Sequence, residues 1–263
     1  RRNFFTFIKF VIMKKSNIFT LVFAILIGLS TEGCSSSDDN EYQNNTPSNP
    51  VSIEGSGNND VLAWSDEFDG DGSINNEFWN YETGSGGWGN QEVQVYTTNS
   101  TNIVKENGVL KITAVKESNG TYTSARITTQ SKVDFKYARI DIRAKLPSMA
   151  GTWPALWMIG SNFSSVGWPK CGEIDIMEQF ANKTYVQATC HWDHNGGNAN
   201  YGLPMNLSTP TEFHTYSIDW RQGSIKAYVD DVEYFVMSTD STMPFDANFF
   251  LIFNVAMGGT NGG

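Results

Sequence analysis

Three carboxylates stand within six residues of one stretch, residues 172–179, which reads Gly-Glu-Ile-Asp-Ile-Met-Glu-Gln. Alternate side chains of a β-strand point to the same side, so Glu173 and Asp175 share one face and Glu178 falls on the other. A β-bulge near residues 176–177 adds one residue and returns Glu178 to the face of the first two. Three carboxylates side by side repel one another, which costs stability, so their clustering indicates a catalytic role.

Other interpretations of the same stretch are open. In a helix the acids would form a solvated face, but Pro169, Gly172 and the β-rich surroundings disfavour a helix. A solvated edge strand is the main rival. A metal site is a weaker one, because no histidine lies within the stretch and only His191 lies near it. We therefore predict no metal ligands.

Composition limits the classes of partner. The chain has 263 residues with a formal net charge of -10, and it contains 8 Trp, 10 Tyr and 17 Phe. The acidic balance argues against nucleic acid and, more weakly, against a polyanionic substrate. Many aromatic and few basic side chains suit a protein that stacks on neutral sugar rings.

The N-terminal region has the pattern of a secretory signal, which we place at residues 1–34. Residues 1–12 are interpreted as an upstream extension and Met13 as the true start, followed by Lys14, Lys15 and an apolar run over residues 18–29. A run of this length after a basic segment is typical of a signal peptide and short for a membrane span. An uncleaved anchor helix is the alternative.

The end of this region resembles a lipoprotein box, in which Cys34 would become the lipidated first residue. Glu32 is an unusual occupant of such a box, so ordinary cleavage nearby is the alternative. The Ser-Ser-Ser-Asp-Asp sequence at 35–39 resembles the acidic export tag of surface-displayed bacterial lipoproteins. We expect a secreted or cell-surface lipoprotein, anchored through Cys34 and facing outward from the outer membrane.

Residues 35–60 are rich in Ser, Asn, Pro and Gly and have few apolar side chains, so they are expected to be a flexible linker. One folded domain of about 200 residues follows, over residues 61–263, which is enough for a β-sandwich with a buried core. The domain stops after a glycine-rich segment at 258–263, and we expect a closing strand to be missing there, leaving an exposed sheet edge.

Alternating and apolar segments predict an all-β domain. Residues 137–146 alternate apolar and polar side chains, and residues 109–115 follow the turn dipeptide Asn-Gly. Residues 224–229 and 232–235, separated by Asp-Asp, are typical of a hairpin. The continuous apolar run at 249–253 indicates a strand buried on both faces. With no long amphipathic helix, this pattern predicts an antiparallel β-sandwich.

Two cysteines remain after Cys34, and they flank the acidic stretch. Cys171 and Cys190 would pair in an oxidising compartment, or would be two small buried side chains on neighbouring strands. We favour the unpaired state.

Several aromatic and polar side chains are candidates for sugar contacts. Trp153 and Trp157 precede the acidic stretch, and Trp88 stands in a glycine-flanked loop with Asn90 and Glu92. Indole faces stack on pyranose rings, although tryptophan equally fills cores. Two further side chains are undecided in the same way: Arg126, a surface cation or a donor to sugar hydroxyls, and His191, a structural or a site residue.

These residues together resemble glycoside hydrolase family 16. The Glu-Ile-Asp-Ile-Met-Glu sequence at 173–178 is similar to its E-x-D-x-x-E signature in the bulged form, residues 64–70 to its opening, and residues 153–157 to its substrate platform. Residues 87–92 and 96–97 resemble the laminarinase (endo-1,3-β-glucanase) subgroup. The resemblance implies a β-jelly roll with a concave sugar-binding sheet and hydrolysis with retention of configuration.

The resemblance also implies roles for single residues. Glu173 would be the nucleophile, Glu178 the general acid/base and Asp175 the auxiliary carboxylate between them. A retaining enzyme needs two carboxyls about 5–5.5 Å apart, one ionised and one protonated. Trp153 and Trp157 would line the subsites beside the cleaved bond.

By the same resemblance, Trp88, Asn90 and Arg126 would hold the non-reducing side of the glucan, and His191 would lie near the catalytic carboxylates. No cofactor is required for catalysis. A structural calcium on the convex side would take a ligand from a C-terminal strand that this chain lacks.

The function expected is therefore a monomeric, surface-tethered endo-1,3-β-glucanase that binds β-glucan. Alternatives within the family are a mixed-linkage 1,3-1,4-β-glucanase, an agarase or a carrageenase, and the negative charge disfavours sulfated galactans. Outside enzymes, the alternative is a non-catalytic glucan-binding module, which is expected to lack Glu173 and Glu178. A purely structural surface lipoprotein would leave the carboxylates unexplained.

Overall fold

The computed structural model describes residues 2–10, 50–54 and 62–263 of the chain. The expected signal over most of its length, the anchor at Cys34 and most of the expected linker lie outside the described residues. Among the described residues, no helix has the length and the apolar character that crossing a membrane requires.

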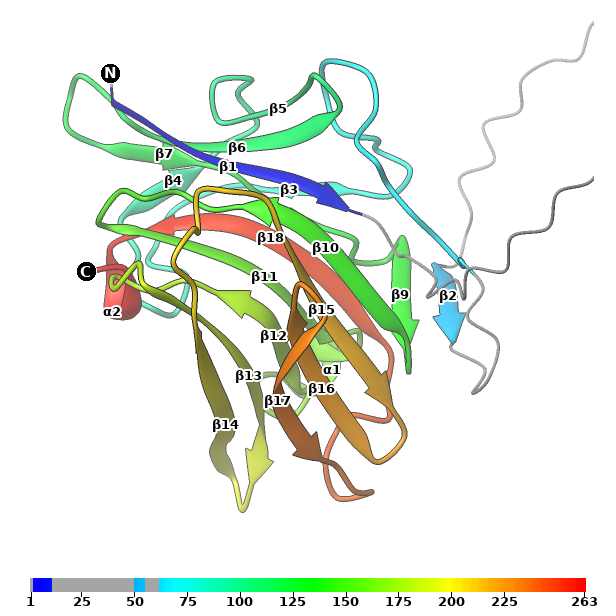
Figure 1. Cartoon of the computed structure of the whole chain (residues 1–263). Coiled ribbons are helices and arrows are strands. Elements are labelled where there is room, and N and C mark those ends of the chain that lie inside the picture. Colours follow the sequence, from blue (N-terminus) through cyan, green and yellow to red (C-terminus); the bar gives the residue numbers. More distant parts are fainter. Residues whose placement is uncertain (1, 11–49, 55–61) are drawn as a thin grey trace, which may run out of the picture.

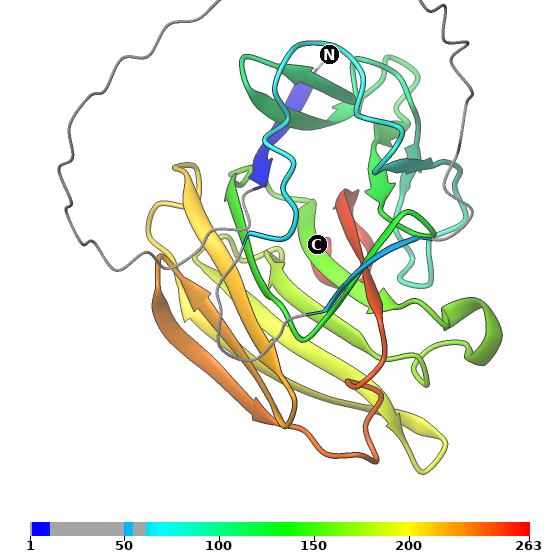
Figure 2. The ribbon, with the colours of Figure 1, turned by 90° about the vertical axis from the view of Figure 1, so that its right-hand side faces the viewer.

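Two curved β-sheets lie face to face and form the domain (Figure 1, Figure 2). Within the described residues each sheet has nine strands. In spatial order, the first sheet, sheet A, contains β17 (Val232–Ser238), β16 (Ser224–Val229), β15 (His214–Arg221), β10 (Arg139–Lys145), β1 (Arg2–Phe10), β6 (Val109–Lys116), β7 (Tyr122–Ser124) and β4 (Gln94–Tyr96), with β5 (Ile103–Glu106) paired to β6.

The second sheet, sheet B, carries the acidic stretch. In spatial order it contains β14 (Gly197–Asn206), β13 (Tyr185–His194), β12 (Glu173–Glu178), β11 (Thr152–Gly160), β18 (Phe249–Met257), β8 (Arg126–Thr128) and β3 (Asn80–Glu82), with β9 (Val133–Lys136) paired to β18 and β2 (Val51–Glu54) paired to β9. The pairs are antiparallel except for β2 with β9 and β4 with β7. The predicted antiparallel jelly-roll sandwich is confirmed.

The main core fills the space between the sheets. Sheet A contributes side chains such as Ile140 and Trp220, and sheet B contributes Met158, Ile174 and Phe249, all of them buried. The Trp220 and Phe249 rings meet edge to face across the core, with centroids 5.2 Å apart. Burial of these faces is the main source of stability, at roughly 25 cal/mol per Å² of apolar surface.

A smaller apolar cluster lies on the other face of sheet B. It consists of Ile159, Cys171, Phe250 and Ile252, with Trp157 packed against it. Strand β18 is therefore buried along its whole length, as the apolar run predicted. The face of sheet B that points away from the main core thus has a small apolar cluster of its own, and polar side chains project from the same face.

The strands expected from alternation are confirmed. β10, β6 and the β16–β17 hairpin match the predicted segments. Asn107 and Gly108 both have positive φ, as do Asp230 and Asp231, which is the conformation of two-residue hairpin turns. The described helices are two short ones, α1 (Phe163–Val166) and α2 (Gly259–Gly262).

The structure differs from the expected domain boundaries in two places. β1 lies between β10 and β6 in sheet A, although its residues were assigned to the region before the signal. β2 lies within the segment expected to be a linker and pairs in parallel with β9. Val51 and Ile53 give β2 an alternating apolar pattern, and composition over a window of 26 residues, 35–60, hides so short a strand.

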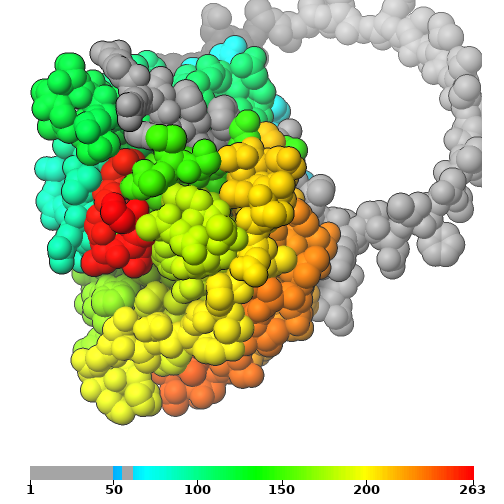
Figure 3. Space-filling model, turned by 60° about the vertical axis from the view of Figure 1, so that its left-hand side comes forward, coloured from blue at the N-terminus to red at the C-terminus, as the bar shows by residue number. Residues whose placement is uncertain are grey.

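The C-terminal residues pack against the loop that follows β12. Ala181 N–H donates to Asn261 O over 2.8 Å, and α2 follows β18 directly. In Figure 3 the red surface of these residues lies against the yellow-green surface of the middle of the chain. Cys171 and Cys190 are free and buried, as favoured from the sequence.

Candidate active site

The predicted bulge is present in β12 and brings the three carboxylates to one face. Against β13, Asp175 pairs with Thr189 and Glu178 pairs with Gln187. Between these two pairs β12 therefore advances by three residues while β13 advances by two. Against β11, Met177 pairs with Leu156 and Asp175 with Trp157, which leaves one residue of β12 unmatched. Ile176 and Met177 are both in the main core, and the carboxylates lie on the opposite face.

Burial raises the pKa of each carboxyl in this group, which we call the carboxylate cluster (Glu173, Asp175 and Glu178), and repulsion from neighbouring carboxylates adds to the effect at the two glutamates. Burial first and then Asp175 raise the pKa of Glu173 to about 8. Burial raises the pKa of Asp175 to about 8, and burial together with Asp175 and Glu173 raises that of Glu178 well above its ordinary value. The cluster therefore holds its protons more tightly than isolated carboxyls do.

The surroundings of the two glutamates are not equivalent. His191, a hydrogen bond from Trp168 and the charge of Arg126 all lower the pKa of Glu173. Two carboxylates, Asp175 and Glu173, raise the pKa of Glu178, and the opposing effects of Trp153 and His191 are smaller. We therefore expect Glu173 to lose its proton before Glu178, which is the division of labour that an ionised nucleophile and a protonated acid require.

Trp153 contacts Glu178 directly. Its indole Nε1 donates a hydrogen bond to Glu178 Oε1 over 3.0 Å, and the Trp153 side chain is 7% exposed. The hydrogen bond lowers the pKa of Glu178 and fixes one of its oxygens. The indole ring packs against Phe180 edge to face. Trp153 thus orients a carboxyl, and its burial leaves little of its face for a sugar.

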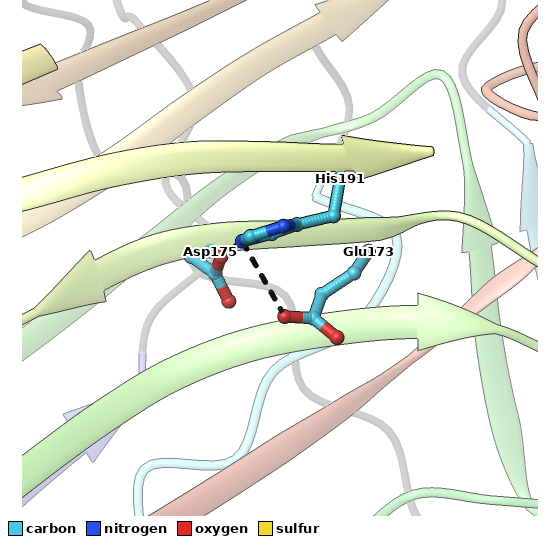
Figure 4. A group of neighbouring side chains, drawn as sticks. All are labelled: Glu173, Asp175 and His191. Carbon is cyan, nitrogen blue, oxygen red and sulfur yellow. Dashed lines mark ion pairs between the residues drawn. The ribbon is translucent and has the colours of Figure 1, made fainter. Parts of the chain in front are cut away.

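His191 and Trp168 lie at the Glu173 end of the cluster. His191 pairs with Glu173 across β12 and β13, and its Nε2 lies 3.9 Å from Glu173 Oε1 and 3.5 Å from Asp175 Oδ2 (Figure 4). His191 therefore lies beside two of the three carboxylates, and its role toward a glucan stays a prediction. Trp168 was not predicted; it is 45% exposed and its ring lies 6.0 Å from that of His191. An aromatic residue directly before Pro169 and the acidic stretch was the available signal.

A second group, which we call the aromatic wall, consists of Trp88, Arg126 and Trp157. The Arg126 guanidinium carbon lies 4.9 Å from the ring centroid of each tryptophan, so the cation is held between two indoles. Such cation–π contacts contribute about 0.5–2 kcal/mol each. Glu82, on the adjacent strand β3, forms an ion pair with Arg126 Nε. The Trp88 Nε1 atom is buried and has no hydrogen-bond partner among the residues that the structure describes.

A series of hydrogen bonds connects Trp157 of the aromatic wall to Glu92. Trp157 Nε1 donates to Asn254 Oδ1 over 2.8 Å, and Asn254 Nδ2 donates to Tyr96 Oη over 3.1 Å. Tyr96 Oη then donates to Glu92 Oε2 over 3.2 Å, and Gln94 Nε2 donates to the same oxygen over 2.6 Å. We call Asn254, Tyr96, Glu92 and Gln94 the support chain.

The support chain joins the glycine-rich loop to the centre of sheet B. Asn254 was not singled out from the sequence, although a polar residue inside the apolar run of β18 was a readable signal. Asn90 is exposed in that loop, and its Nδ2 lies 3.4 Å from Glu92 Oε1. Asn90 therefore lies beside the support chain, and its exposed side chain is open to a ligand.

One group of side chains in the described part of the chain has the spacing of metal ligands: Glu173, Asp175 and His191. These side chains come from sheet B. The described residues of sheet A include no such group, so the calcium implied by the resemblance has no side-chain cluster there, and it stays a prediction.

The chain is similar in sequence to known glycosyl hydrolases. The family model for glycosyl hydrolases family 16 matches residues 89–263. The "Beta-glucanase" of Rhodothermus marinus is 41% identical over 220 residues, covering 77% of this chain and 77% of that protein. The "Glucan endo-1,3-beta-glucosidase" of Cryptopygus antarcticus is 38% identical over 224 residues, covering 76% and 81%.

The fold is also similar to that of a solved laminarinase. The crystal structure of the laminarinase from Flavobacterium sp. UMI-01 matches with a TM-score of 0.70 and 40% identity, covering 77% of this chain and 91% of that one. At this identity the likeness extends beyond fold to sequence over the same region.

Proposed function

The chain belongs to glycosyl hydrolases family 16, and on that premise we propose that it hydrolyses 1,3-β-glucan internally, with laminarin-like chains as substrate. The relatives named for 1,3-β-glucan and laminarin support this linkage. The observation that carries the proposal is the bulge in β12, which gathers Glu173, Asp175 and Glu178 on one face of sheet B. A glucan-binding module has no need of three mutually repelling carboxylates.

We assign the chemistry as a double displacement. Glu173 attacks the anomeric carbon while the bond to the leaving oxygen breaks, and Glu178 gives that oxygen its proton. Glu178, now ionised, takes a proton from water, and the water oxygen replaces Glu173 at the anomeric carbon. The configuration is retained and both carboxyls return to their starting state. Neither step draws on a cofactor.

Asp175 is assigned as the auxiliary carboxylate. Its charge raises the pKa of both Glu173 and Glu178. Once Glu173 has been consumed as a glycosyl ester, one negative charge leaves the cluster and Glu178 can ionise more readily. This change in charge between the two steps allows Glu178 to serve first as acid and then as base.

The test measures release of reducing sugar from laminarin, barley mixed-linkage glucan and agarose. Strong activity on laminarin is expected for the native protein and for Glu212→Gln, which alters an exposed glutamate away from the cluster. Loss of at least about a thousandfold is expected for Glu173→Gln, because removal of a catalytic nucleophile costs several orders of magnitude in kcat. Activity on agarose alone would reject the substrate, and full activity of Glu173→Gln would reject the nucleophile.

Azide distinguishes the roles of the two glutamates. In Glu173→Ala, azide replaces the nucleophile in the first displacement, so the α-glycosyl azide is expected. In Glu178→Ala, azide attacks the glycosyl-enzyme, so the β-glycosyl azide is expected, best seen with an activated aryl glycoside. The opposite pairing of products would exchange the two assignments.

We further propose that the enzyme is a monomer displayed on the cell surface through a lipid at Cys34. Support comes from the basic and apolar leader, the Gly-Cys pair at 33–34 and the acidic serine-rich stretch at 35–39. Fractionation of cells that express the full chain tests this. Glucanase is expected in the outer membrane for the native protein and in soluble fractions for Cys34→Ser, and an unchanged distribution would reject the anchor.

A further inference from the structure

We propose that Glu173, Asp175 and His191 form a binding site for a divalent transition-metal cation, with Zn²⁺ as the reference ion, and that bound metal excludes glucan. The sequence predicted no metal ligands because it contains one histidine near the acidic stretch. The pairing of β12 with β13 places that histidine directly opposite Glu173. Figure 4 shows the three side chains converging from these two strands.

The spacing of the three side chains suits a small cation. His191 Nε2 lies 3.5 Å from Asp175 Oδ2 and 3.9 Å from Glu173 Oε1, and ligand atoms of all three lie within 4.8 Å of one another. Tetrahedral Zn²⁺ with bonds of about 2.0–2.2 Å separates its ligands by about 3.3–3.6 Å. The His191–Asp175 pair already has this separation. A small rotation of the Glu173 side chain would bring Glu173 Oε1 to the same distance from His191 Nε2.

A second observation that favours a bound cation is the buried Asp175 carboxylate. Its side chain is 4% exposed, and Oδ2, the oxygen that faces His191, has no hydrogen-bond donor within the described part of the chain. A buried acceptor without a partner costs about 1–3 kcal/mol, and more when charged. A cation held by Oδ2 removes this cost, as a proton does.

The other ring nitrogen of His191 points to the same conclusion. His191 Nδ1 lies 3.4 Å from Asn198 Oδ1, an amide oxygen that can accept a hydrogen bond from Nδ1–H. In the tautomer that makes this hydrogen bond, the lone pair of Nε2 faces the two carboxylates. Histidines that bind metals commonly donate their second ring N–H to an oxygen in this way, which fixes the tautomer. Asn198 is therefore a positioning residue of the proposed site.

Metal and glucan cannot occupy this site together. The oxygen of Glu173 that binds the cation is on the carboxylate assigned to attack the anomeric carbon, so a bound ion blocks its approach to the sugar. Inhibition is expected to be competitive with laminarin and reversible by a chelator. The proposal concerns the binding of metal, so its measurement does not depend on the enzyme's substrate.

The test is calorimetric titration of Zn²⁺ into the full chain, prepared without a histidine tag and stripped with chelator. One site is expected in the native protein, with affinity reduced at least tenfold in His191→Gln. His194→Gln is the matched control, because His194 lies three residues further along β13, is exposed, and belongs to neither the cluster nor the proposed site. It should bind as the native protein does.

Two further variants and a competitor complete the test. Asp175→Asn and Asn198→Ala should each weaken the binding of Zn²⁺, and they test the proposed site if His191→Gln fails to fold. Laminaritriose added first should reduce the apparent affinity for Zn²⁺. No binding up to millimolar Zn²⁺, or binding that His191→Gln and Asp175→Asn leave unchanged, would overturn the proposal. An enzyme active on laminarin that binds no Zn²⁺ keeps its function and loses only this site.

Discussion

The carboxylate cluster and the aromatic wall stand on the same sheet, yet they are built in opposite ways. In the cluster, acids repel one another, and Asp175 Oδ2 has no hydrogen-bond donor among the described residues. In the wall, Arg126 has an ion pair and two indole faces, and Trp157 is tied to Asn254. The cluster is poised to change its charge during a reaction, whereas the wall is held in one arrangement.

This difference predicts where substitutions act. A change in the cluster is expected to alter the rate of the chemical step and to relieve strain in the fold. A change in the support chain of the wall is expected to alter binding of the glucan, with the chemical step intact. Measurements of kcat, KM, stability and pH dependence on the same variants separate the two regions.

Beyond the nucleophile, the largest effect is expected for Glu178→Gln, which removes the proton donor. A positioned general acid contributes about 10²–10⁴-fold, so kcat on laminarin should fall within that range. An aryl glycoside with a good leaving group needs little protonation, so its first step should be nearly unaffected. Equal losses on both substrates, measured by burst kinetics, would contradict the assignment of Glu178 as acid.

Asp175→Asn is expected to lower activity and raise stability. Because the folded state raises the Asp175 pKa from 3.8 to about 8, the folded protein holds a proton that the unfolded chain releases between these values. Stability is therefore lost as pH rises through this window. The amide should raise the melting temperature at pH 8 by about 2–4 °C, equivalent to ~1 kcal/mol, and change it less at pH 4.

The control for Asp175→Asn is Asp193→Asn, at the far end of β13 and outside the cluster. Thermal unfolding of both variants at the two pH values gives the comparison. If Asp175→Asn lowers the melting temperature at pH 8, Asp175 is a stabilising contact and the contrast between the cluster and the wall fails.

Trp153→Phe is expected to have an intermediate effect on the cluster. The Trp153 hydrogen bond lowers the pKa of Glu178, so its removal raises that pKa and keeps the acid protonated to higher pH. The alkaline limb of kcat/KM should move upward by up to about 1 pH unit, equivalent to ~1.4 kcal/mol. The pH–rate profile measures this, with Trp192→Phe, packed on Phe245, as control. A downward shift would mean that Trp153 stabilises the protonated form.

The cluster could be read from the sequence because its signal is local. Strand periodicity alone puts Glu178 on the wrong face, and one extra residue at 176–177 corrects it. The aromatic wall and its partners could be predicted only in part from the sequence. Glu82, Arg126 and Asn254 become neighbours because β3, β8 and β18 pair, and these strands are far apart in the chain. No local pattern encodes that register. Strand β1 was missed for the same reason, because its partners β6 and β10 are distant.

The smallest effect is expected for Tyr96→Phe, and it decides whether the support chain positions the wall. The change removes only the hydroxyl that connects Asn254 to Glu92. A net hydrogen bond is worth about 1 kcal/mol, so KM for laminarin should rise by up to about fivefold with kcat nearly constant. Tyr216→Phe is the matched control, because the Tyr216 hydroxyl is buried in sheet A and has no hydrogen-bond partner in the described part of the chain. If Tyr96→Phe lowers kcat instead, the support chain acts on the carboxylates, and the two regions are one catalytic unit.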